Sequence, residues 1–155
     1  MLTIAQAETA PQIDEVRRLF REYEAALDLD LCFQGFEAEL AELPGRYAPT
    51  DGRLLLAYWG EKLVGCIALR KIGEGICEMK RLYVRDEARG LGIGLALIER
   101  IIDEARGQGY SAMRLDTSTV KMAKAIKLYE SHGFRRIEAY YNNPHPDVIY
   151  MELVL

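Results

Sequence analysis

The sequence is poor in the residues that would indicate disulfide bonds, a metal site or a membrane span. Its 155 residues include three cysteines, two histidines and one tryptophan. Cys32, Cys66 and Cys77 lie in apolar surroundings without a C-x-x-C pair, so we expect free buried thiols and no metal ligation. No apolar run reaches the length of a membrane span, and residues 1–12 lack the basic and apolar regions of a signal peptide. These absences favour a cytoplasmic protein.

Long runs of one charge are also absent. The net charge is −4, and we interpret the basic pairs Arg17-Arg18, Lys80-Arg81 and Arg135-Arg136 as solvated surface. Without a basic stripe, nucleic-acid binding is not expected, whereas an amine substrate suits the acidic balance. Half of the residues are apolar, enough to build a core, and the length predicts a single domain over residues 1–155.

The most informative stretch is residues 78–102, whose pattern predicts a strand, a glycine-rich turn and a helix. Gly90, Gly92 and Gly94 occupy alternate positions, with Arg89 just ahead of them. The N–H groups at a helix N-terminus have no intrahelical partner, and the helix dipole adds partial positive charge there. Because glycine lets the main chain approach a bulky anion, this turn predicts a phosphate-binding cradle. A plain strand-to-helix turn is the alternative, but it explains one glycine better than three.

Two other phosphate-binding motifs fit this turn less well. The segment lacks the Gly-Lys-Ser/Thr ending of a P-loop. A dinucleotide-binding fingerprint would begin at Gly90-x-Gly92 and place a ribose-binding acid at Asp116, but its third glycine would fall at Leu95. Too little chain follows Asp116 for the remaining strand–helix units of such a domain.

Two segments resemble the GCN5-related N-acetyltransferase (GNAT) family. Residues 89–94, Arg-Gly-Leu-Gly-Ile-Gly, match the family signature Q/R-x-x-G-x-G/A. Residues 128–134, Leu-Tyr-Glu-Ser-His-Gly-Phe, are similar to the family's LYEKxGF segment. The two occur in the expected order, with a strand-like segment at residues 112–117 between them. The resemblance is strong over about residues 50–155 and rests on pattern alone before them.

The resemblance implies an acetyl-CoA-dependent N-acetyltransferase that needs no metal. The backbone of Leu82, Tyr83 and Val84 would contact the pantetheine arm, with one backbone N–H polarising the acetyl carbonyl. The residues that would hold the pyrophosphate follow directly in the sequence: Arg89, Gly90, Leu91, Gly92, Ile93, Gly94 and Leu95.

Tyr129 matches the family tyrosine whose hydroxyl approaches the coenzyme sulfur. That position suits a general acid returning a proton to the leaving thiolate, although a tyrosine there could also only pack or position the cofactor. Many relatives have an asparagine seven residues upstream, where this sequence has Met122. The missing cofactor contact would then come from one of three nearby residues, Ser118, Thr119 or Lys124.

Acetylation of an amine also needs a base, because a primary amine is protonated at neutral pH. Glu78 is our first candidate, since it lies on the strand leading to the turn and burial could raise its pKa. A cross-strand partner for Lys80 or Arg81 is the alternative. Cys77 should point to the opposite face from Glu78, which disfavours covalent catalysis.

Two further segments are candidates for contact with the acceptor. The N-terminal helical segments carry four residues that either line the acceptor pocket or simply pack on the sheet: Phe33, Phe36, Glu39 and Tyr47. Residues 140–144, Tyr-Tyr-Asn-Asn-Pro, form either a rim over the acceptor site or an ordinary turn.

Apolar periodicity predicts the order of the elements. Strands are expected at residues 2–7, 54–59, 63–69, 76–84, 112–117, 134–139 and 148–154, and helices at 11–27, 36–43, 93–107 and 120–131. Three strands in hairpin succession followed by a strand–helix–strand crossover indicate an α/β fold with a mixed sheet. The resemblance implies a mostly antiparallel central sheet of about six to seven strands flanked by about four helices.

We therefore predict transfer of acetyl from acetyl-CoA to a primary amine, on a small molecule or a protein, within a ternary complex. The alternative is a catalytically silent acyl-CoA-binding sensor or interaction module, which would keep the glycine turn but need neither Glu78 nor Tyr129. No nucleic acid or membrane is expected as a partner, and a homodimer is compatible with the resemblance.

Overall fold

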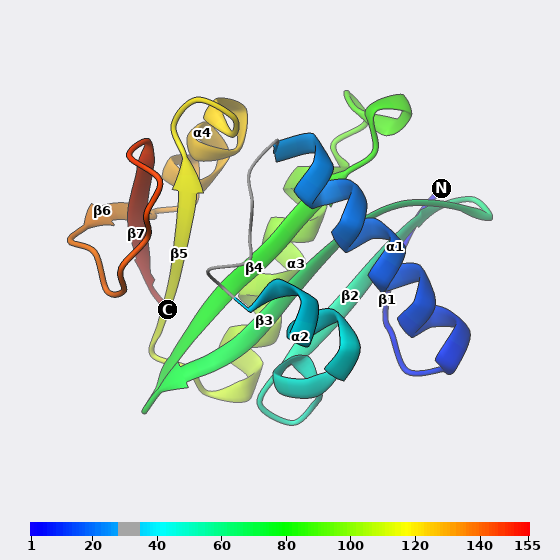
Figure 1. Ribbon diagram of the computed structural model, residues 1–155, viewed down its shortest axis with the longest axis horizontal. Coiled ribbons are helices and arrows are strands. Elements are labelled where there is room, and N and C mark those ends of the chain that lie inside the picture. Colours follow the sequence, from blue (N-terminus) through cyan, green and yellow to red (C-terminus); the bar gives the residue numbers. More distant parts are fainter. Residues whose placement is uncertain (28–34) are drawn as a thin grey trace.

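The computed structural model describes residues 1–27 and 35–155, which form a seven-stranded sheet with helices on both faces (Figure 1). The strands lie in the order β1-β2-β3-β4-β5-β7-β6. They are β1 (Leu2–Gln6), β2 (Arg53–Trp59), β3 (Lys62–Gly73), β4 (Ile76–Val84), β5 (Ala112–Ser118), β6 (Arg135–Ile137) and β7 (Val148–Val154). The α-helices of the described residues are α1 (Ala10–Leu27), α2 (Phe36–Glu42), α3 (Ile93–Gln108) and α4 (Ala123–Ser131).

One neighbouring pair of strands within the described sheet is parallel. β4 and β5 run in the same direction and are joined by α3, whereas the other neighbouring strands pair antiparallel. This arrangement confirms the predicted mixed, mostly antiparallel sheet with flanking helices. It excludes a dinucleotide-binding domain, because such domains are built on a mainly parallel sheet.

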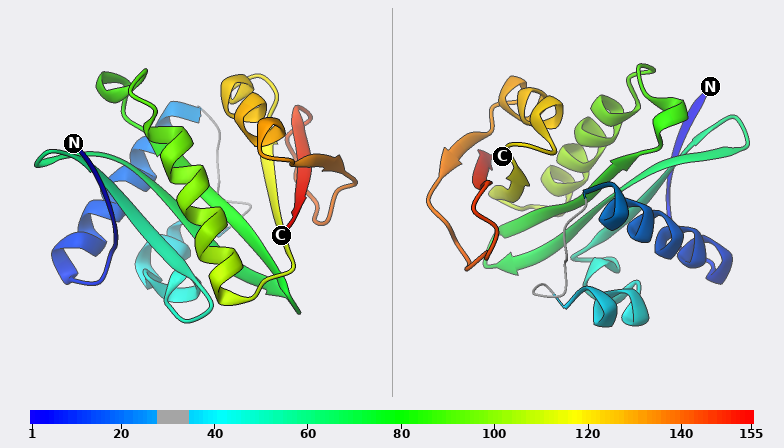
Figure 2. Two further views of the ribbon diagram at one scale, coloured as in Figure 1. Left: turned by 180° about the vertical axis from the view of Figure 1, so that it is seen from behind. Right: turned by 45° about the horizontal axis from the view of Figure 1, so that its top comes forward.

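The sheet separates two apolar cores. α3 and α4 cover one face, seen in the left view of Figure 2, and α1 and α2 cover the other, which faces the reader in Figure 1. Leu69 of β3 packs in the core beneath α3 with Leu97. Its neighbour Ala68 packs in the core beneath α1 and α2 with Phe20. Successive side chains of a strand point to opposite faces, so each strand contributes to both cores.

One side of α3 is an apolar stripe that is buried against the sheet. Ile93, Leu97, Ile101 and Ala105 lie on one side of the helix at steps of four residues and face the sheet. The helix ends at Gly109, whose φ of 93° is left-handed and whose N–H bonds back to the last turn.

α1 begins with a cap formed by Thr9 and Gln12. Gln12 N–H donates to the Thr9 hydroxyl oxygen at 3.3 Å, while Thr9 N–H donates to the Gln12 side-chain oxygen at 3.0 Å. This reciprocal pair is a capping box that satisfies two exposed donors of the first turn. None of the helices in residues 1–27 and 35–155 is both long and apolar enough to cross a membrane.

Several predicted boundaries differ from the structure by one residue, and those of β3, α4 and β6 differ by more. β3 continues to Gly73 and does not end at residue 69. α4 begins at Ala123 and not at residue 120, because Ser118 accepts hydrogen bonds from the N–H groups of Lys121 and Met122 and holds the intervening residues in a turn. β6 begins at Arg135 and ends at Ile137, since the N–H of the preceding Phe134 is used to close the end of α4.

Candidate functional site

The glycine turn precedes α3 as predicted, and two of its glycines adopt a conformation that other residues avoid. Gly90 and Gly92 have φ values of 82° and 76°, in the left-handed region. A Cβ atom at either position would meet no protein atom within 4 Å, so the turn is open on that side. The first turn of α3 contains no acidic residue. Unpaired N–H groups and the helix dipole therefore combine into a geometry that binds phosphate.

A pocket lies where β4 and β5 separate. The two strands pair only where Ile76–Glu78 meet Ala112–Arg114, although β4 continues to Val84 and β5 to Ser118. The pocket is lined by residues of both strands beyond this paired segment. Within the described chain, β4 therefore has backbone groups on the β5 side without a partner strand.

A bulge at Arg81 accompanies this separation. Arg81 has a φ of 61°, and the pairing of β4 with β3 shifts register beside it. Left-handed conformation at such a residue costs about 1–3 kcal/mol. Two 3.0 Å hydrogen bonds from the Arg81 guanidinium to Glu39 oppose that strain, as does its position 5.0 Å from the centroid of the Phe36 ring.

The alternation of side chains along β4 and β5 gives the pocket two different walls. Met79 and Leu115 line it and belong to the core beneath α3, and we call this side the apolar wall. Lys80 and Asp116 line it from the other face of the sheet. Lys80 follows Met79 and Asp116 follows Leu115, and successive side chains of a strand point to opposite faces. Lys80 pairs with Ala68 of the core beneath α1 and α2, which fixes its direction. We call this side the charged wall.

Tyr129 of α4 lines the pocket, where its ring packs 5.7 Å from that of Phe134. The helix ends in a Schellman motif, in which Gly133 N–H donates to the Glu130 carbonyl and Phe134 N–H to the Tyr129 carbonyl, both at 3.1 Å. The Tyr129 hydroxyl makes no hydrogen bond to the described residues. Burial raises its pKa well above the usual value of 10, so the hydroxyl stays protonated at neutral pH and can donate.

Glu78 is 1% exposed and is not among the residues that line this pocket. Arg70 Nε donates to its Oε1 at 2.8 Å, and the Tyr140 hydroxyl donates to its Oε2 at 2.6 Å. Burial alone would raise the pKa of Glu78, but the cations of Lys80 and Arg70 and the Tyr140 hydrogen bond together lower it.

The predicted rise in the Glu78 pKa is therefore wrong. The alternative, in which Glu78 is a cross-strand partner of Lys80 or Arg81, is not what the structure shows. The salt-bridge partner of Glu78 is Arg70 of β3. With both carboxylate oxygens engaged, Glu78 is well placed to fix the positions of Arg70 and Tyr140. That Glu78 is the catalytic base stays a prediction.

Asp116 supplies a carboxylate to the charged wall. Its Oδ2 accepts hydrogen bonds from the Tyr141 hydroxyl and from Asn143 Nδ2, the latter at 3.3 Å. Its Oδ1 accepts none from the described part of the chain. The sequence brought Asp116 forward only as a ribose-binding acid, although its alternation with the apolar Leu115 indicated a side chain on the opposite face.

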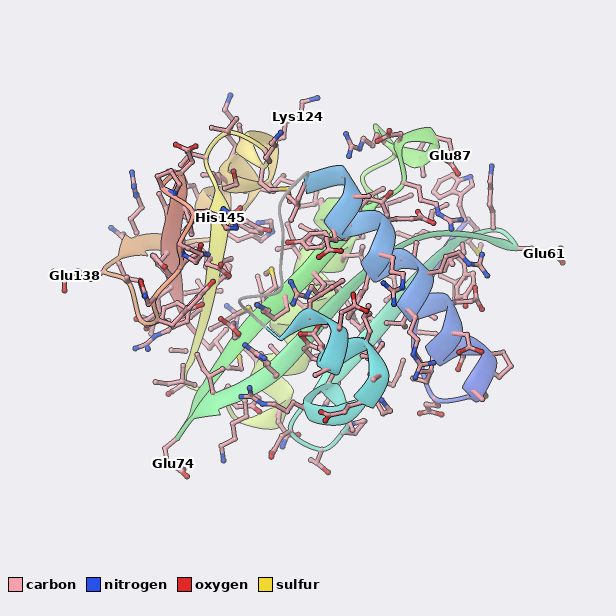
Figure 3. All side chains as sticks on the ribbon, viewed as in Figure 1. Glu61, Glu74, Glu87, Lys124, Glu138 and His145 are labelled. Atoms are coloured by element: carbon pink, nitrogen blue, oxygen red, sulfur yellow. The ribbon has the colours of Figure 1, made fainter. Side chains whose placement is uncertain are left out.

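The loop of residues 138–147 covers the charged wall. Tyr140 and Tyr141 pack edge-to-face on each other and on Tyr150 of β7, with ring centroids 5.4–5.5 Å apart. His145, labelled beside β5 in Figure 3, lines the pocket. The interpretation of this segment as a rim fits that geometry better than an ordinary turn does.

Lys80 and Arg81 are buried, at 5% and 4% exposure, which overturns their interpretation as solvated surface. Both line the pocket. Burial and the neighbouring Arg81 guanidinium together lower the pKa of Lys80 to about 8, against the opposing influence of Glu78 and Asp116. The positions of Lys80 and Arg81 beside apolar residues in the sequence did not reveal that they are buried. They are buried because β4 is covered on both faces of the sheet.

The remaining predicted residues divide between site and core. Leu82 lines the pocket, while the hydroxyl of Tyr83 donates to Glu22 on the face carrying α1. Phe36 and Tyr47 are buried in the core beneath α1 and α2, as the packing alternative predicted. Of the other residues considered, Glu39 bonds Arg81, Cys77 packs beneath α3 opposite Glu78, and Phe33 and Cys32 lie outside the described residues.

The described residues fit an acyl-CoA. Gly90 and Gly92 are open where a phosphate would approach, and the unpaired side of β4 near Leu82 could bond an extended ligand. The adjoining pocket holds a free hydroxyl at Tyr129. Within residues 1–27 and 35–155, no group of three or more His, Cys, Asp and Glu side chains is arranged to hold a metal ion.

Comparisons with known proteins agree with this geometry. A model of the acetyltransferase (GNAT) family matches residues 13–134. An uncharacterised N-acetyltransferase of Schizosaccharomyces pombe is 41% identical over 155 residues, covering 98% of this chain and 94% of that protein. Another, of Dictyostelium discoideum, is 33% identical over 216 residues, covering 99% and 100%.

Solved structures share the fold. An acetyltransferase from Streptococcus agalactiae superposes with a TM-score of 0.78 at 25% identity, covering 99% of this chain and 98% of that one. The PaiA N-acetyltransferase of Thermoplasma acidophilum, solved in complex with coenzyme A, gives 0.76 at 19% identity, covering 100% and 99%. Matched by the family model over most of its length and by full-length relatives, this chain belongs to the GNAT family of N-acetyltransferases.

Proposed function

We propose that the protein transfers the acetyl group of acetyl-CoA to a primary amine, by direct transfer within a ternary complex. Membership of the GNAT family supports acetyl transfer in general. The observation that carries the finer proposal is one pocket with an apolar wall and a charged wall, which offers separate places for donor and acceptor. The choice of donor is supported by the coenzyme A complex of a protein with the same fold.

The backbone of this chain would hold the donor. Residues 89–95 would bind its pyrophosphate through N–H groups at the start of α3. Residues 82–84 of β4 would bond its extended arm and polarise the acetyl carbonyl through a backbone N–H. The donor itself supplies an activated thioester. Because these contacts use main-chain groups, they need little from the side chains beyond the glycines.

Tyr129 is the group we propose as the general acid. Tyr129 lines the pocket, its hydroxyl has no hydrogen-bond partner in the described residues, and its raised pKa keeps that hydroxyl protonated at neutral pH. A proton held in this way is available to the thiolate when it leaves. The distance between the Tyr129 hydroxyl and the thioester sulfur then depends on where the thioester binds along β4.

We propose Asp116 as the group that receives the amine. Its Oδ1 has no hydrogen bond within the described chain, so it can accept one from the ammonium and take its proton, directly or through a water. Glu78 is the second candidate base, acting from beside the pocket. Its two oxygens are already engaged by Arg70 and Tyr140, which makes Asp116 the stronger candidate.

Calorimetric titration with acetyl-CoA, beside NADH as control, tests the donor. We expect micromolar binding of acetyl-CoA and none of NADH. Initial rates with acetyl-CoA and an amine both varied should then give intersecting double-reciprocal lines. Parallel lines would reject direct transfer, and tight acetyl-CoA binding without turnover of any amine would favour an acyl-CoA sensor.

A further inference from the structure

Two apolar side chains stand at the point where β4 and β5 separate. The parallel pairing of these strands ends with Glu78 opposite Arg114. The next residue on each strand, Met79 on β4 and Leu115 on β5, lines the pocket. Both are almost fully buried and pack in the core beneath α3. The end of the pocket at which the strands meet is therefore apolar, and the proposed proton transfers use neither side chain.

The direction of β4 brings the acyl group of the donor to this end. The phosphate-binding turn follows the end of β4 at Val84, whereas the strands meet at the other end of β4, as Figure 1 shows. An arm that bonds the unpaired side of β4 therefore runs from Val84 back toward Met79. It has to stop there, because β5 takes over the pairing at Glu78. The acyl group, at the tip of the arm, then lies beside Met79 and Leu115.

An acyl group in this position has one side on which extra carbons would have to go. The way forward is closed by the paired segment of β4 and β5. The charged wall, which carries Asp116, is the side from which the acceptor approaches in the proposed function. Added methylenes therefore turn toward the apolar wall, where Met79 and Leu115 already pack in the core. A close-packed core accepts extra volume only by shifting its side chains, which is unfavourable.

We infer that Met79 and Leu115 set the length of the acyl group that the protein takes from its donor, admitting acetyl and excluding longer chains. They act by volume, since neither side chain carries a charge. Methionine is unbranched and adapts its shape, so one added methylene is tolerated better than two. Butyryl, with two more methylenes than acetyl, is therefore the sharper probe. The inference rests on the proposed function and names the residues that select its donor.

Calorimetric titration with CoA, acetyl-CoA and butyryl-CoA, without an acceptor, tests the inference. In the wild type we expect the affinity for butyryl-CoA to be about tenfold or more below that for acetyl-CoA. In Met79→Ala and in Leu115→Ala the difference should shrink to less than about threefold, because each substitution opens space beside the acyl group. Where an amine is acylated, the ratio of kcat/KM for the two donors should change in the same direction.

Met113→Ala is the matched control. Met113 lies two residues before Leu115 on β5 and is buried in the same core, but it does not line the pocket. Its acetyl-to-butyryl ratio should match the wild type. If the alanine variants do not fold, the smaller truncations Met79→Val and Leu115→Val decide.

Three results would overturn the inference while leaving the donor site in place. They are equal affinity of the wild type for butyryl-CoA and acetyl-CoA, an unchanged ratio in the Met79 and Leu115 variants, or the same change of ratio in Met113→Ala. Absence of binding of both acetyl-CoA and CoA would instead overturn the proposed function.

Discussion

On the wall facing α3 the pocket is lined by apolar side chains such as Met79 and Leu115, whereas the wall facing α1 and α2 carries Lys80, Arg81 and Asp116. The first wall belongs to the face covered by α3, whose first turn has backbone N–H groups without intrahelical partners. The second offers side-chain charges held by ion pairs and by tyrosine hydroxyls. In the proposed function, backbone groups bind the donor and the side-chain charges of the second wall contact the acceptor. The predictions below test that division.

The largest effect is expected at the glycine turn. Gly92→Glu places a negative side chain at a left-handed residue where phosphate would bind, so acetyl-CoA affinity should fall at least about 100-fold. Calorimetry measures this loss. Gly107→Glu is the matched control, because Gly107 lies in the last part of the same helix and a Cβ there meets no atom within 4 Å. Retained affinity in Gly92→Glu would remove the donor site from this turn.

The next effect concerns the stability of the charged wall. Glu39→Ala leaves the buried Arg81 guanidinium without its partner, and the free energy of unfolding should fall by about 3 kcal/mol. Glu37→Ala, on the same helix, breaks only the exposed pair with Arg21 and should cost less than about 0.5 kcal/mol. Urea denaturation of the two variants measures the difference. Equal losses would show that Arg81 is satisfied in another way.

Tyr129→Phe separates chemistry from donor binding. Loss of the hydroxyl should lower kcat about 100-fold, because the thiolate loses its proton donor, while acetyl-CoA affinity stays within about threefold. Tyr58→Phe serves as control, since Tyr58 lies on β2 and its hydroxyl bonds Glu15 outside the pocket. An unchanged kcat would leave Tyr129 with a packing role alone.

The two carboxylates can be compared directly. Asp116→Asn should lower kcat/KM by about tenfold or more, because the amine loses its proton acceptor. Glu78→Gln should cost less, because Glu78 is not among the residues that line the pocket and both of its oxygens are engaged by Arg70 and Tyr140. A larger loss in Glu78→Gln than in Asp116→Asn would make Glu78 the base.

Much of the fold followed from local patterns. β4 and β7 have the predicted bounds, and α1 and α2 differ from prediction by one residue at one end. The predicted fold class is confirmed as well. The start of α4 was predicted too early, because Ser118 holds residues 119–122 in a turn that helical periodicity does not reveal.

The site was predicted unevenly, and the two walls explain why. Glycines at alternate positions before an apolar helix determine the phosphate turn by themselves, because left-handed φ values and free N–H groups are local properties. The charged wall is formed by β4 and β5, which are distant in the sequence. Cys77 of β4 donates its thiol to the carbonyl of Ala112, 35 residues further along the chain. Only the tertiary structure decided that Lys80 and Arg81 are buried, that Asp116 lines the pocket and that Glu78 is bound by Arg70 and Tyr140. Burial and pKa depend on which distant groups surround a side chain, and a strand pattern does not carry that information.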